Sequence, residues 1–350
     1  NGDGTATLSG TPTNAEVGAH NVVLQVADQG ALTDTQAFTI TVTNTNDAPV
    51  ITSDGGGAAA ALNLAENTTA VTTVTSTDVD GGTPTYSIAG GADAALFSID
   101  GASGALTFNT APNFEAPADA GANNVYDVTV QVSDGNGGTD TQTISITVSD
   151  DNEAPTDIAP NSFSINENVD TTGGVSLGTL TATDVDSGDT ATYTIVPGGD
   201  GALFSIGGAS SDELILTDGV LNHEAKPSYT VTVRVTDGAA NTYDEVLTVT
   251  VNDLNEAPSI TSTATTGATE DTPYSYAITT TDPDTGAVLA ITAPTLPAWL
   301  TLTDNGDGTA TLSGTPTNAE VGAHNVVLQV ADQGALTDTQ AFTITVTNTN

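Results

Sequence analysis

Residues 143–148 read Thr-Ile-Ser-Ile-Thr-Val, a run in which apolar and hydroxyl side chains alternate strictly. Successive side chains of a β-strand point to opposite faces of the sheet, so Ile144, Ile146 and Val148 would all face a core. The hydroxyl side chains would then face solvent. The run therefore predicts a strand in a sheet with one buried face.

Similar short runs recur through residues 153–255, separated by turn clusters such as Pro197-Gly-Gly-Asp-Gly201. Seven of them are predicted as strands, at 163–166, 175–182, 191–196, 203–206, 213–216, 229–236 and 245–251. No segment has a helical period over three turns. Seven short strands in about 100 residues are typical of a β-sandwich with Greek-key connections, so the chain is predicted to be all-β.

The composition excludes several classes of protein. The chain has 350 residues, with 44 Asp and Glu against 2 Lys and Arg, and its formal charge is −42. Nucleic-acid binding requires a basic face, which two cationic side chains cannot supply. The sequence has no Cys, and its apolar runs are much shorter than the roughly 18 residues of a membrane-spanning helix. We therefore expect no disulfide, no thiolate site, no membrane span and no signal peptide at the start.

Two repeats of different length organise the chain. Residues 1–46 recur letter for letter as residues 305–350, an offset of 304 residues. A shorter motif occurs as Asn44-Thr-Asn-Asp-Ala-Pro49, Asp150-Asp-Asn-Glu-Ala-Pro155 and Asp253-Leu-Asn-Glu-Ala-Pro258. These repeats predict domains at 47–152, 153–255 and 256–350. Residues 1–46 would be half of a further domain, which lacks a counterpart of 256–304 and cannot bury a core alone. The chain is interpreted as a segment of a longer array with a 304-residue, three-domain unit.

Acidic residues occur in the same order in the two central domains. Each has an early Glu, an Asp-Val-Asp pair, an Asn-x-Glu box, an Asp-Gly before the last strand and an acidic exit. All of these lie between predicted strands, and therefore at the ends of a sandwich. Two carboxylates about 6 Å apart repel by about 3 kcal/mol at an effective dielectric constant of 20. Gathered acids therefore predict bound cations, and oxygen ligands without Cys favour Ca²⁺.

These motifs resemble those of cadherin repeats, in the form found in long bacterial surface proteins. The boxes that carry the resemblance are Pro112-Asn-Phe-Glu115 and Leu221-Asn-His-Glu224, together with the linkers quoted above. Residues 256–350 differ, since Leu296-Pro-Ala-Trp-Leu300 and Ser313-Gly-Thr-Pro-Thr317 resemble a putative-immunoglobulin domain of the dystroglycan type, which lacks the box. The resemblance implies tandem seven-stranded Greek-key sandwiches, cadherin- or immunoglobulin-like, in an extended rod.

The resemblance also implies a calcium cluster at each junction between domains. Between 47–152 and 153–255 the implied ligands are Glu66, Asn113, Glu115, Asp150, Asn152, Glu153, Asp184, Asp186 and Asp237. Between 153–255 and 256–350 they are Glu167, Asn222, Glu224, Asp253, Asn255, Glu256, Asp282, Asp284 and Asp332. The junction after residue 43 offers Asn44, Asn46, Asp47, Asp78, Asp80 and Asp134. Fewer or weaker ions are expected there, with Glu16 and its copy Glu320 as substitute upstream ligands.

The pattern as a whole predicts a calcium-stiffened, repetitive stalk of a secreted or cell-surface bacterial adhesin or extracellular filament. Its partners would be neighbouring repeats of the same longer chain, and other copies of the protein or surface glycans. The alternative is a module that itself binds copies of the protein or polysaccharide in a calcium-dependent way. Enzymatic activity is not expected, because paired carboxylates such as Asp78 and Asp80 recur in every domain, whereas a catalytic pair needs one cleft. His223, inside its box, is expected to be exposed.

Overall fold

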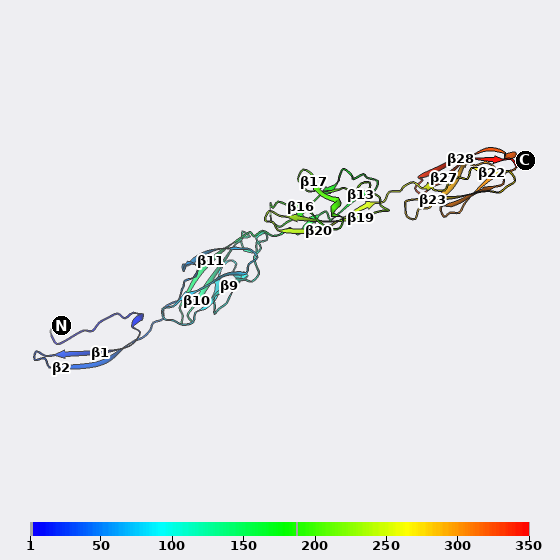
Figure 1. Ribbon diagram of the computed structural model, residues 1–350. Coiled ribbons are helices and arrows are strands. Elements are labelled where there is room, and N and C mark those ends of the chain that lie inside the picture. Colours follow the sequence, from blue (N-terminus) through cyan, green and yellow to red (C-terminus); the bar gives the residue numbers. More distant parts are fainter. Residues whose placement is uncertain (1–2, 187, 350) are drawn as a thin grey trace. The chain divides into compact units, whose positions relative to one another are not determined.

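A computed structural model describes residues 3–186 and 188–349 of the chain. The outermost residues of the predicted domains 1–46 and 256–350 therefore lie outside the described residues. The chain divides into two compact units, Asn1–Glu153 and Ala154–Asn350, each of which is built from strands (Figure 1). The helices among the described residues are single 3-10 turns: η1 (Asn14–Glu16), η2 (Ser53–Gly55), η3 (Ala94–Leu96), η4 (Gly201–Leu203) and η5 (Asn318–Glu320). None of these is long and apolar enough to cross a membrane.

The first unit contains a hairpin followed by a β-sandwich. Strands β1 (Gly18–Ala27) and β2 (Thr33–Val42) form a two-stranded antiparallel sheet. The sandwich has a sheet in the order β4-β11-β10-β7, a sheet in the order β5-β9-β8, and the pair β3-β6. Its strands are β3 (Val50–Ile51), β4 (Ala59–Ala65), β5 (Ala70–Thr73), β6 (Ser76–Thr77), β7 (Thr85–Gly90), β8 (Phe97–Ile99), β9 (Ala105–Phe108), β10 (Val125–Ser133) and β11 (Thr139–Ser149).

The second unit contains two sandwiches. The first has sheets in the orders β13-β20-β19-β16 and β14-β18-β17 and the pair β12-β15; the second has sheets in the orders β22-β28-β27-β24 and β21-β23-β26-β25. The strands of the first are β12 (Asp157–Ala159), β13 (Ser162–Asn166), β14 (Val175–Thr179), β15 (Thr181–Thr183), β16 (Thr192–Val196), β17 (Phe204–Gly207), β18 (Glu213–Leu216), β19 (Ser228–Thr236) and β20 (Thr242–Asn252). Those of the second are β21 (Ser259–Ile260), β22 (Gly267–Thr269), β23 (Tyr274–Thr281), β24 (Ala290–Thr295), β25 (Leu300–Asp304), β26 (Thr309–Gly314), β27 (Gly322–Ala331) and β28 (Thr337–Thr347).

One pairing is common to all three sandwiches: an early strand runs parallel to the last strand. β4 pairs with β11, β13 with β20, and β22 with β28. The pairs end in register, at Ala65 with Ser149, Asn166 with Asn252, and Thr269 with Thr347. The residue that follows the early strand therefore lies beside the segment by which the chain leaves the sandwich.

Each sandwich has its own core, and the three cores share no residue. Ile144, Ile146 and Val148 lie in the first of them with exposures of 1% or less, as the alternation predicts. Trp299 packs against the third core, next to the ring of Tyr274. The prediction of an all-β chain of tandem sandwiches is confirmed.

The seven strands predicted within 153–255 are present, with one difference. The run 175–182 forms two strands, β14 and β15, which pair with β18 and β12 respectively. The break between the two strands is at Leu180. It lies two residues after Gly178, where φ is 150° and the register of β14 shifts. Leu180 turns into the core at the break, and its N–H donates to the carbonyl of Asp212. Strand β12 was not predicted, because three residues around Ile158 are too short for a periodic signal.

Because the cores are separate, a core truncation should affect one sandwich only. We expect Leu247→Ala, at a fully buried position of β20, to destabilise that sandwich by about 2–5 kcal/mol through lost burial and the remaining cavity. Differential scanning calorimetry would show one component of the unfolding profile at a lower temperature. The neighbouring Val246 is 59% exposed, so Val246→Ala should leave the profile unchanged. Equal effects of the two substitutions would contradict the assignment of the core face.

Candidate metal centre

A buried glutamate follows the early strand in both central domains. Glu66 and Glu167 are each 1% exposed, and each donates its backbone N–H to the end of the last strand, at Ser149 and Asn252. Oε1 of Glu167 accepts from the backbone N–H of Leu254 at 2.7 Å, and Oε2 accepts from that of His223 at 2.8 Å. Glu66 has the same two bonds, to Asp151 and Phe114. One carboxylate in each domain therefore connects three segments. They are the early strand (β4 or β13), the box (112–115 or 221–224) and the exit from the domain (150–153 or 253–256).

These connections gather acids that are far apart in the sequence. In the first unit, ligand atoms of Glu66, Glu115, Asp150 and Glu153 lie within 4.8 Å of one another. In the second unit, Glu167, Glu224, Asp253 and Glu256 form the equivalent group. All eight residues were predicted as ligands. The predicted ligands Asn113 and Asn222 lie in the same boxes, where their Oδ1 atoms accept from the backbone N–H groups of Ala116 and Ala225.

The Asp-x-Asp pairs have the same local structure in all three domains. Oδ1 of the first Asp accepts from the backbone N–H of the second, at 2.8 Å for Asp78, 3.0 Å for Asp184 and 2.9 Å for Asp282. Oδ2 of each first Asp is buried and has no hydrogen-bond partner. A buried carboxylate oxygen without a hydrogen-bond partner costs folding free energy. The equivalent oxygen of the Asp-x-Asp pair is in this state in each of the three domains.

In the second unit, the linker 253–256 contacts the domain that follows it. The backbone N–H of Glu256 donates to Asp284 at 3.0 Å, and the Asn255 amide donates to Asp332 at 2.6 Å. Asp282, Asp284 and Asp332 form a further group with ligand atoms within 4.8 Å. Asn168 also donates to Glu256, at 2.7 Å. Seven of the nine predicted residues of this junction thus lie in two groups, which the linker connects.

Asp184 and Asp186 also form a group, and its third member is Asp189. Asp189 was not predicted, because it lies outside the Asp-x-Asp motif. Asp237 is outside the group, but with Asp184 and Asp189 it lines one small cavity of about 60 Å³. The predicted central junction includes these Asp residues of the second unit and the group around Glu66, with Asn152, of the first. Its assembly therefore stays a prediction.

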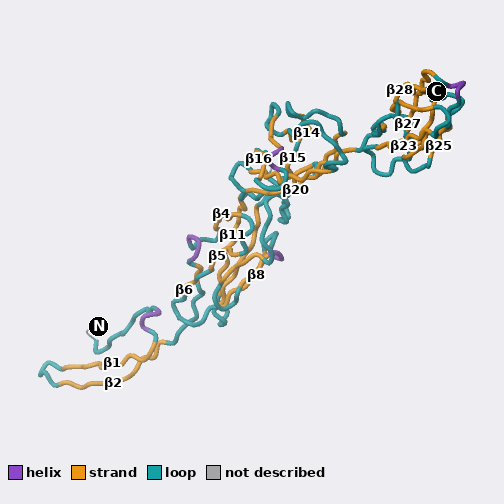
Figure 2. The backbone as a smooth tube through the Cα atoms, turned by 45° about the vertical axis from the view of Figure 1, so that its right-hand side comes forward, coloured by secondary structure: helices purple, strands orange, loops and turns teal. Residues whose placement is uncertain are grey.

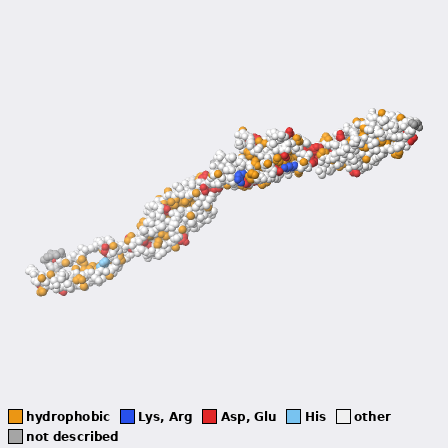
Figure 3. Space-filling view, viewed as in Figure 1, with side chains coloured by type: hydrophobic (Ala, Val, Ile, Leu, Met, Phe, Trp, Pro, Cys, Tyr) orange, Lys and Arg blue, Asp and Glu red, His pale blue; other side chains and the backbone are white. Residues whose placement is uncertain are grey.

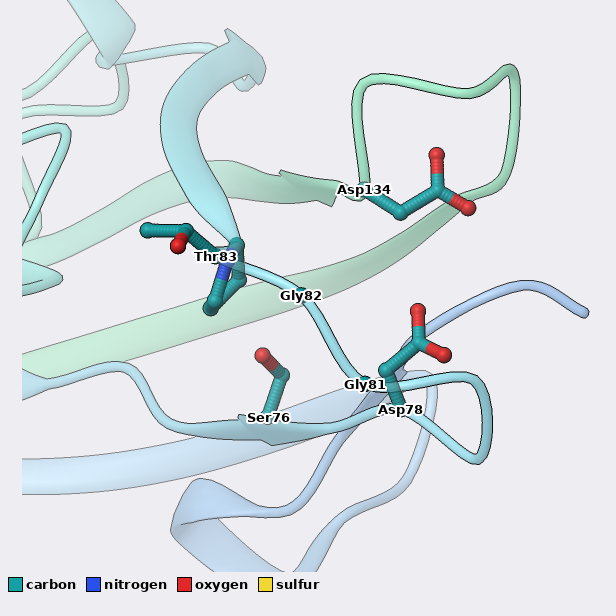
Figure 4. Close-up of a pocket in the computed structure, with 7 residues that line it drawn as sticks. Ser76, Asp78, Gly81, Gly82, Thr83 and Asp134 are labelled. Atoms are coloured by element: carbon teal, nitrogen blue, oxygen red, sulfur yellow. The ribbon is translucent and has the colours of Figure 1, made fainter.

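The predicted junction after residue 43 is built differently. Asp80 accepts hydrogen bonds from the backbone N–H of Asp47 at 2.6 Å, from the amide of Asn14 at 2.9 Å, and from Asn44. The amide of Asn46 donates to Asp134 at 2.7 Å. Asp78 and Asp134 line a cavity of about 110 Å³, with both carboxylates on one side of it (Figure 4). Among the described residues, no three acids of this junction gather as closely as in the other groups.

The two basic side chains neutralise acids outside these groups. Lys226 pairs with Asp200 at 2.6 Å and lies over the ring of Tyr229. Arg234 makes two hydrogen bonds to Asp244, at 2.7 and 2.8 Å. The space-filling view accordingly shows far more acidic than basic side chains (Figure 3). His223 is half-buried rather than exposed, with Nδ1 3.4 Å from Glu224 and 3.6 Å from Asp253.

The electrostatic surroundings of the carboxylates differ between the junctions. Burial raises the pKa of Asp253, Glu256 and Asp282, and the neighbouring carboxylate of Asp284 raises each further. At the other junction, the hydrogen bond from the Asp47 backbone lowers the pKa of Asp80, and that from Asn46 lowers the pKa of Asp134. Amide groups thus stabilise the charged carboxylates after residue 43, while the junction at 253–256 leaves its charges poorly compensated.

One residue of this kind was missed in the sequence. Glu270 follows β22, donates its N–H to Thr347, and accepts from the backbone and hydroxyl of Thr349 at 2.8 and 2.7 Å. It is 4% exposed, and its Oε2 has no hydrogen-bond partner. It is thus the counterpart of Glu66 and Glu167 in the domain without the box. The sequence feature that the three glutamates share is an Asn or Asp directly after the Glu. In the structure these residues, Asn67, Asn168 and Asp271, all have positive φ, at 59°, 63° and 59°.

The suggested substitutes Glu16 and Glu320 have a local role. Oε2 of Glu320 accepts from the backbone and hydroxyl of Thr317 at 2.7 and 2.6 Å, and Glu16 has the same bonds to Thr13. These bonds close a capping box on η5 and η1. They also lower the pKa of both glutamates. Each side chain is thus held in its own turn, and neither belongs to the acidic groups of the described residues.

The donor set of the groups fits a hard divalent cation. The ligand atoms are carboxylate oxygens, and among the described residues His223 is the one imidazole that groups with them. Ca²⁺ takes six to eight oxygens in flexible geometry, and the partnerless buried oxygens of Asp184, Asp282 and Glu256 are free to serve it. The residues present therefore fit the ion that the resemblance implies.

Comparisons with protein families agree with this architecture. The family model of the cadherin domain matches residues 161–252. That of the putative Ig domain matches 3–43 and 257–347, and that of a bacterial Ig domain matches 46–147. The chain is a tandem array of cadherin-like and immunoglobulin-like domains. For 46–147 the matching family is an Ig family, whereas the motifs resemble a cadherin repeat. None of the matching families is an enzyme family.

Solved structures of cadherin repeats have the same fold as the array. The Protocadherin GammaB4 extracellular domain is 23% identical with a TM-score of 0.56, over 95% of this chain and 55% of that one. Protocadherin Gamma B2 domains 1–5 are 20% identical with a TM-score of 0.53, over 96% and 67%. Mouse Cadherin-23 EC22-24 is 19% identical with a TM-score of 0.52, over 87% and 100%. The array thus spans about half the length of the first of these.

The raised pKa values predict how protons would compete with Ca²⁺. A carboxyl must lose its proton to bind the ion, and in Asp253, Glu256 and Asp282 the proton is held to a higher pH than usual. As the pH is lowered, we expect calcium affinity, measured by isothermal titration calorimetry, to begin to fall at a higher pH than the range around 4 in which ordinary exposed carboxyls titrate. An affinity that stays constant until that range is reached would contradict this.

Proposed function

We propose that the array is a calcium-stiffened stalk of a secreted or cell-surface bacterial adhesin or extracellular filament. The observation that carries the proposal is the gathering of acids around the linker 253–256 of the second unit. Seven carboxylates contribute to its two groups: Glu167, Glu224, Asp253, Glu256, Asp282, Asp284 and Asp332. The basic side chains of the chain are paired elsewhere, so these charges repel one another without a cation.

The mechanism is linkage between ion binding and the closed junction. An ion that binds the assembled groups and not the separated ones stabilises the assembled arrangement by mass action, by about 2.7 kcal/mol at a concentration 100 times its Kd. Ca²⁺ would supply the positive charge that the chain lacks. The role of the chain itself is to hold the carboxylates together. Glu167 does so by connecting the early strand, the box and the exit. Asn255 and Glu256 then connect the exit to the next domain.

We extend the proposal to the other junctions, which would differ in the number of calcium ions that they bind. The central junction would use Glu66, Asn113, Glu115, Asp150, Asn152 and Glu153 with Asp184, Asp186 and Asp237. The junction after residue 43 would hold fewer ions, because Asn14, Asn44 and Asn46 already bond its carboxylates. Glu270 is proposed as an upstream ligand of the domain without the box. Calcium dependence would therefore vary along the array.

The surface of the array favours a spacer over a sugar-binding module. Aromatic residues make up 4% of the chain, and Tyr126, Tyr193 and Phe204 are typical in being buried in the cores. A polysaccharide site would need exposed aromatic faces. An extracellular location is proposed because millimolar calcium is found outside cells, and because two of the similar solved structures are extracellular domains by their titles.

The junction at 253–256 provides a direct test. We expect millimolar Ca²⁺ to protect the linker 252–258 from proteolysis, compared with EDTA, because ions hold it against both domains. Glu256→Gln should remove much of this protection, since it deletes one charge and replaces one carboxylate oxygen of the group by an amide nitrogen, which cannot bind a cation. Limited proteolysis followed by mass spectrometry would locate the cleavage.

The matched control is Glu213→Gln, which changes the charge equally in strand β18, outside the acidic groups. In this variant, Ca²⁺ should protect the linker from proteolysis as it does in the parent chain. Protection that is independent of Ca²⁺, or equal in the two variants, would refute the proposed site.

A further inference from the structure

The linker glutamate of the second unit is bonded to the domains on both of its sides. Residues 253–258, between β20 and β21, form no strand or helix (Figure 2). The backbone N–H of Glu256 donates to Asp284 of the following domain, at 3.0 Å. Oε1 of the Glu256 side chain accepts from the amide of Asn168 in the preceding domain, at 2.7 Å. Asn168 thus holds the linker carboxylate against the domain that the chain has just left.

The backbone of Asn168 is placed for this bond. Asn168 directly follows the buried Glu167 and has a φ of 63°. Its N–H donates to the carbonyl of Leu221, at the start of the box. Glycine adopts a positive φ with less strain than other residues. An asparagine at such a position therefore indicates that its side chain has a use.

The first unit repeats the arrangement. Asn67 has a φ of 59°, its N–H donates to the carbonyl of Pro112, and its amide donates to Oε1 of Glu153 at 2.5 Å. The domain without the box has Asp271 at this position, with a φ of 59° and its N–H bonded to the carbonyl of Pro316. The backbone feature is therefore common to three domains, whereas the amide donor is found in the two that have the box.

The amide of Asn168 opposes the repulsion within the acidic group. Ligand atoms of four acids lie within 4.8 Å of one another there: Glu167, Glu224, Asp253 and Glu256. Without a donor, the Glu256 side chain would rotate away, because its bonds turn freely in solvent and the other charges repel it. The bond to Oε1 keeps this carboxylate in the group. Its Oε2, which is buried and has no hydrogen-bond partner, is then available to a cation.

We propose that Asn168 and Asn67 are positioning residues, which hold the linker glutamate in the acidic group before any cation binds. Holding the carboxylate in advance removes a conformational cost from ion binding, and so raises the affinity for Ca²⁺. The inference rests on the proposed function for the identity of the ion. The hydrogen bond forms without the ion, so it can be tested in the absence of calcium.

Limited proteolysis of the full chain in EDTA, followed by mass spectrometry, tests the hydrogen bond. We expect Asn168→Gly and Asn168→Asp each to increase the cleavage rate of the linker 252–258 by about fivefold, because the bond no longer opposes its opening. Gly and Asp both accept the positive φ, as Asp271 does, but neither side chain donates to Glu256. Asn67→Gly is the matched control. It should accelerate cleavage next to Glu153 and leave the linker 252–258 unchanged.

The same cleavage followed in a calcium titration reports on this one junction. We expect the calcium concentration that half-protects the linker 252–258 to be about 10- to 100-fold higher in Asn168→Gly than in the parent chain. Asn67→Gly should leave this concentration unchanged, because its amide serves the other linker.

Three results would overturn the inference. They are cleavage in EDTA at the parent rate in both Asn168 variants, faster cleavage in only one of them, and an unchanged half-protecting calcium concentration in Asn168→Gly. Faster cleavage in one variant alone would assign the effect to the glycine backbone or to the added charge. If Ca²⁺ does not protect the linker of the parent chain, the proposed function is wrong, and the cleavage rates in EDTA still decide whether Asn168 holds Glu256.

Discussion

The parallel pairing of an early strand with the last strand is the constraint on which the acidic groups depend. Because β4 and β11, β13 and β20, and β22 and β28 end in register, the residue after the early strand lies beside the exit from the domain. A glutamate at that position is buried, and bonds to backbone N–H groups keep it in place. The acids of the box and the exit are then brought to the same end of the sandwich.

This arrangement concentrates negative charge where the fold gives little compensation. Neutral donors stabilise Glu167 well, but the carboxylates around it have pKa values raised by burial and by one another. The chain does not use its two basic side chains there, because Lys226 and Arg234 each pair with a nearby Asp on another part of the same domain. Under the proposed function, an external cation adds to the hydrogen bonds of Asn255 and Glu256 at this junction, and its contribution grows with the number of carboxylates that the junction gathers.

The array is not uniform along its length. Where the upstream domain lacks the box, the backbone N–H of Asp47, with the amides of Asn44 and Asn14, lowers the pKa of Asp80, and the amide of Asn46 lowers that of Asp134. Amide hydrogen bonds are short-range and neutral, so they stabilise the charges without a cation. The repeated sequence shows a second form of dependence on neighbours, because the hairpin β1–β2 and the strands β27–β28 have the same residues. Local sequence forms the hairpin in both copies, but only residues 256–304 bury its apolar face.

Alternation in runs such as 143–148, the order of the acidic motifs and the exact repeat of 1–46 were sufficient to predict an all-β array and most members of the acidic groups. These are local signals, in which strand period and motif spacing can be read directly. These local signals did not show the interruption of 175–182 at Leu180, the short strand β12, the third member Asp189 or the role of Glu270. The local bonds of Glu16 and Glu320 were missed for the same reason. Which strands pair, and which oxygens are left without a partner, depends on contacts between residues distant in sequence, and only the tertiary structure decides these.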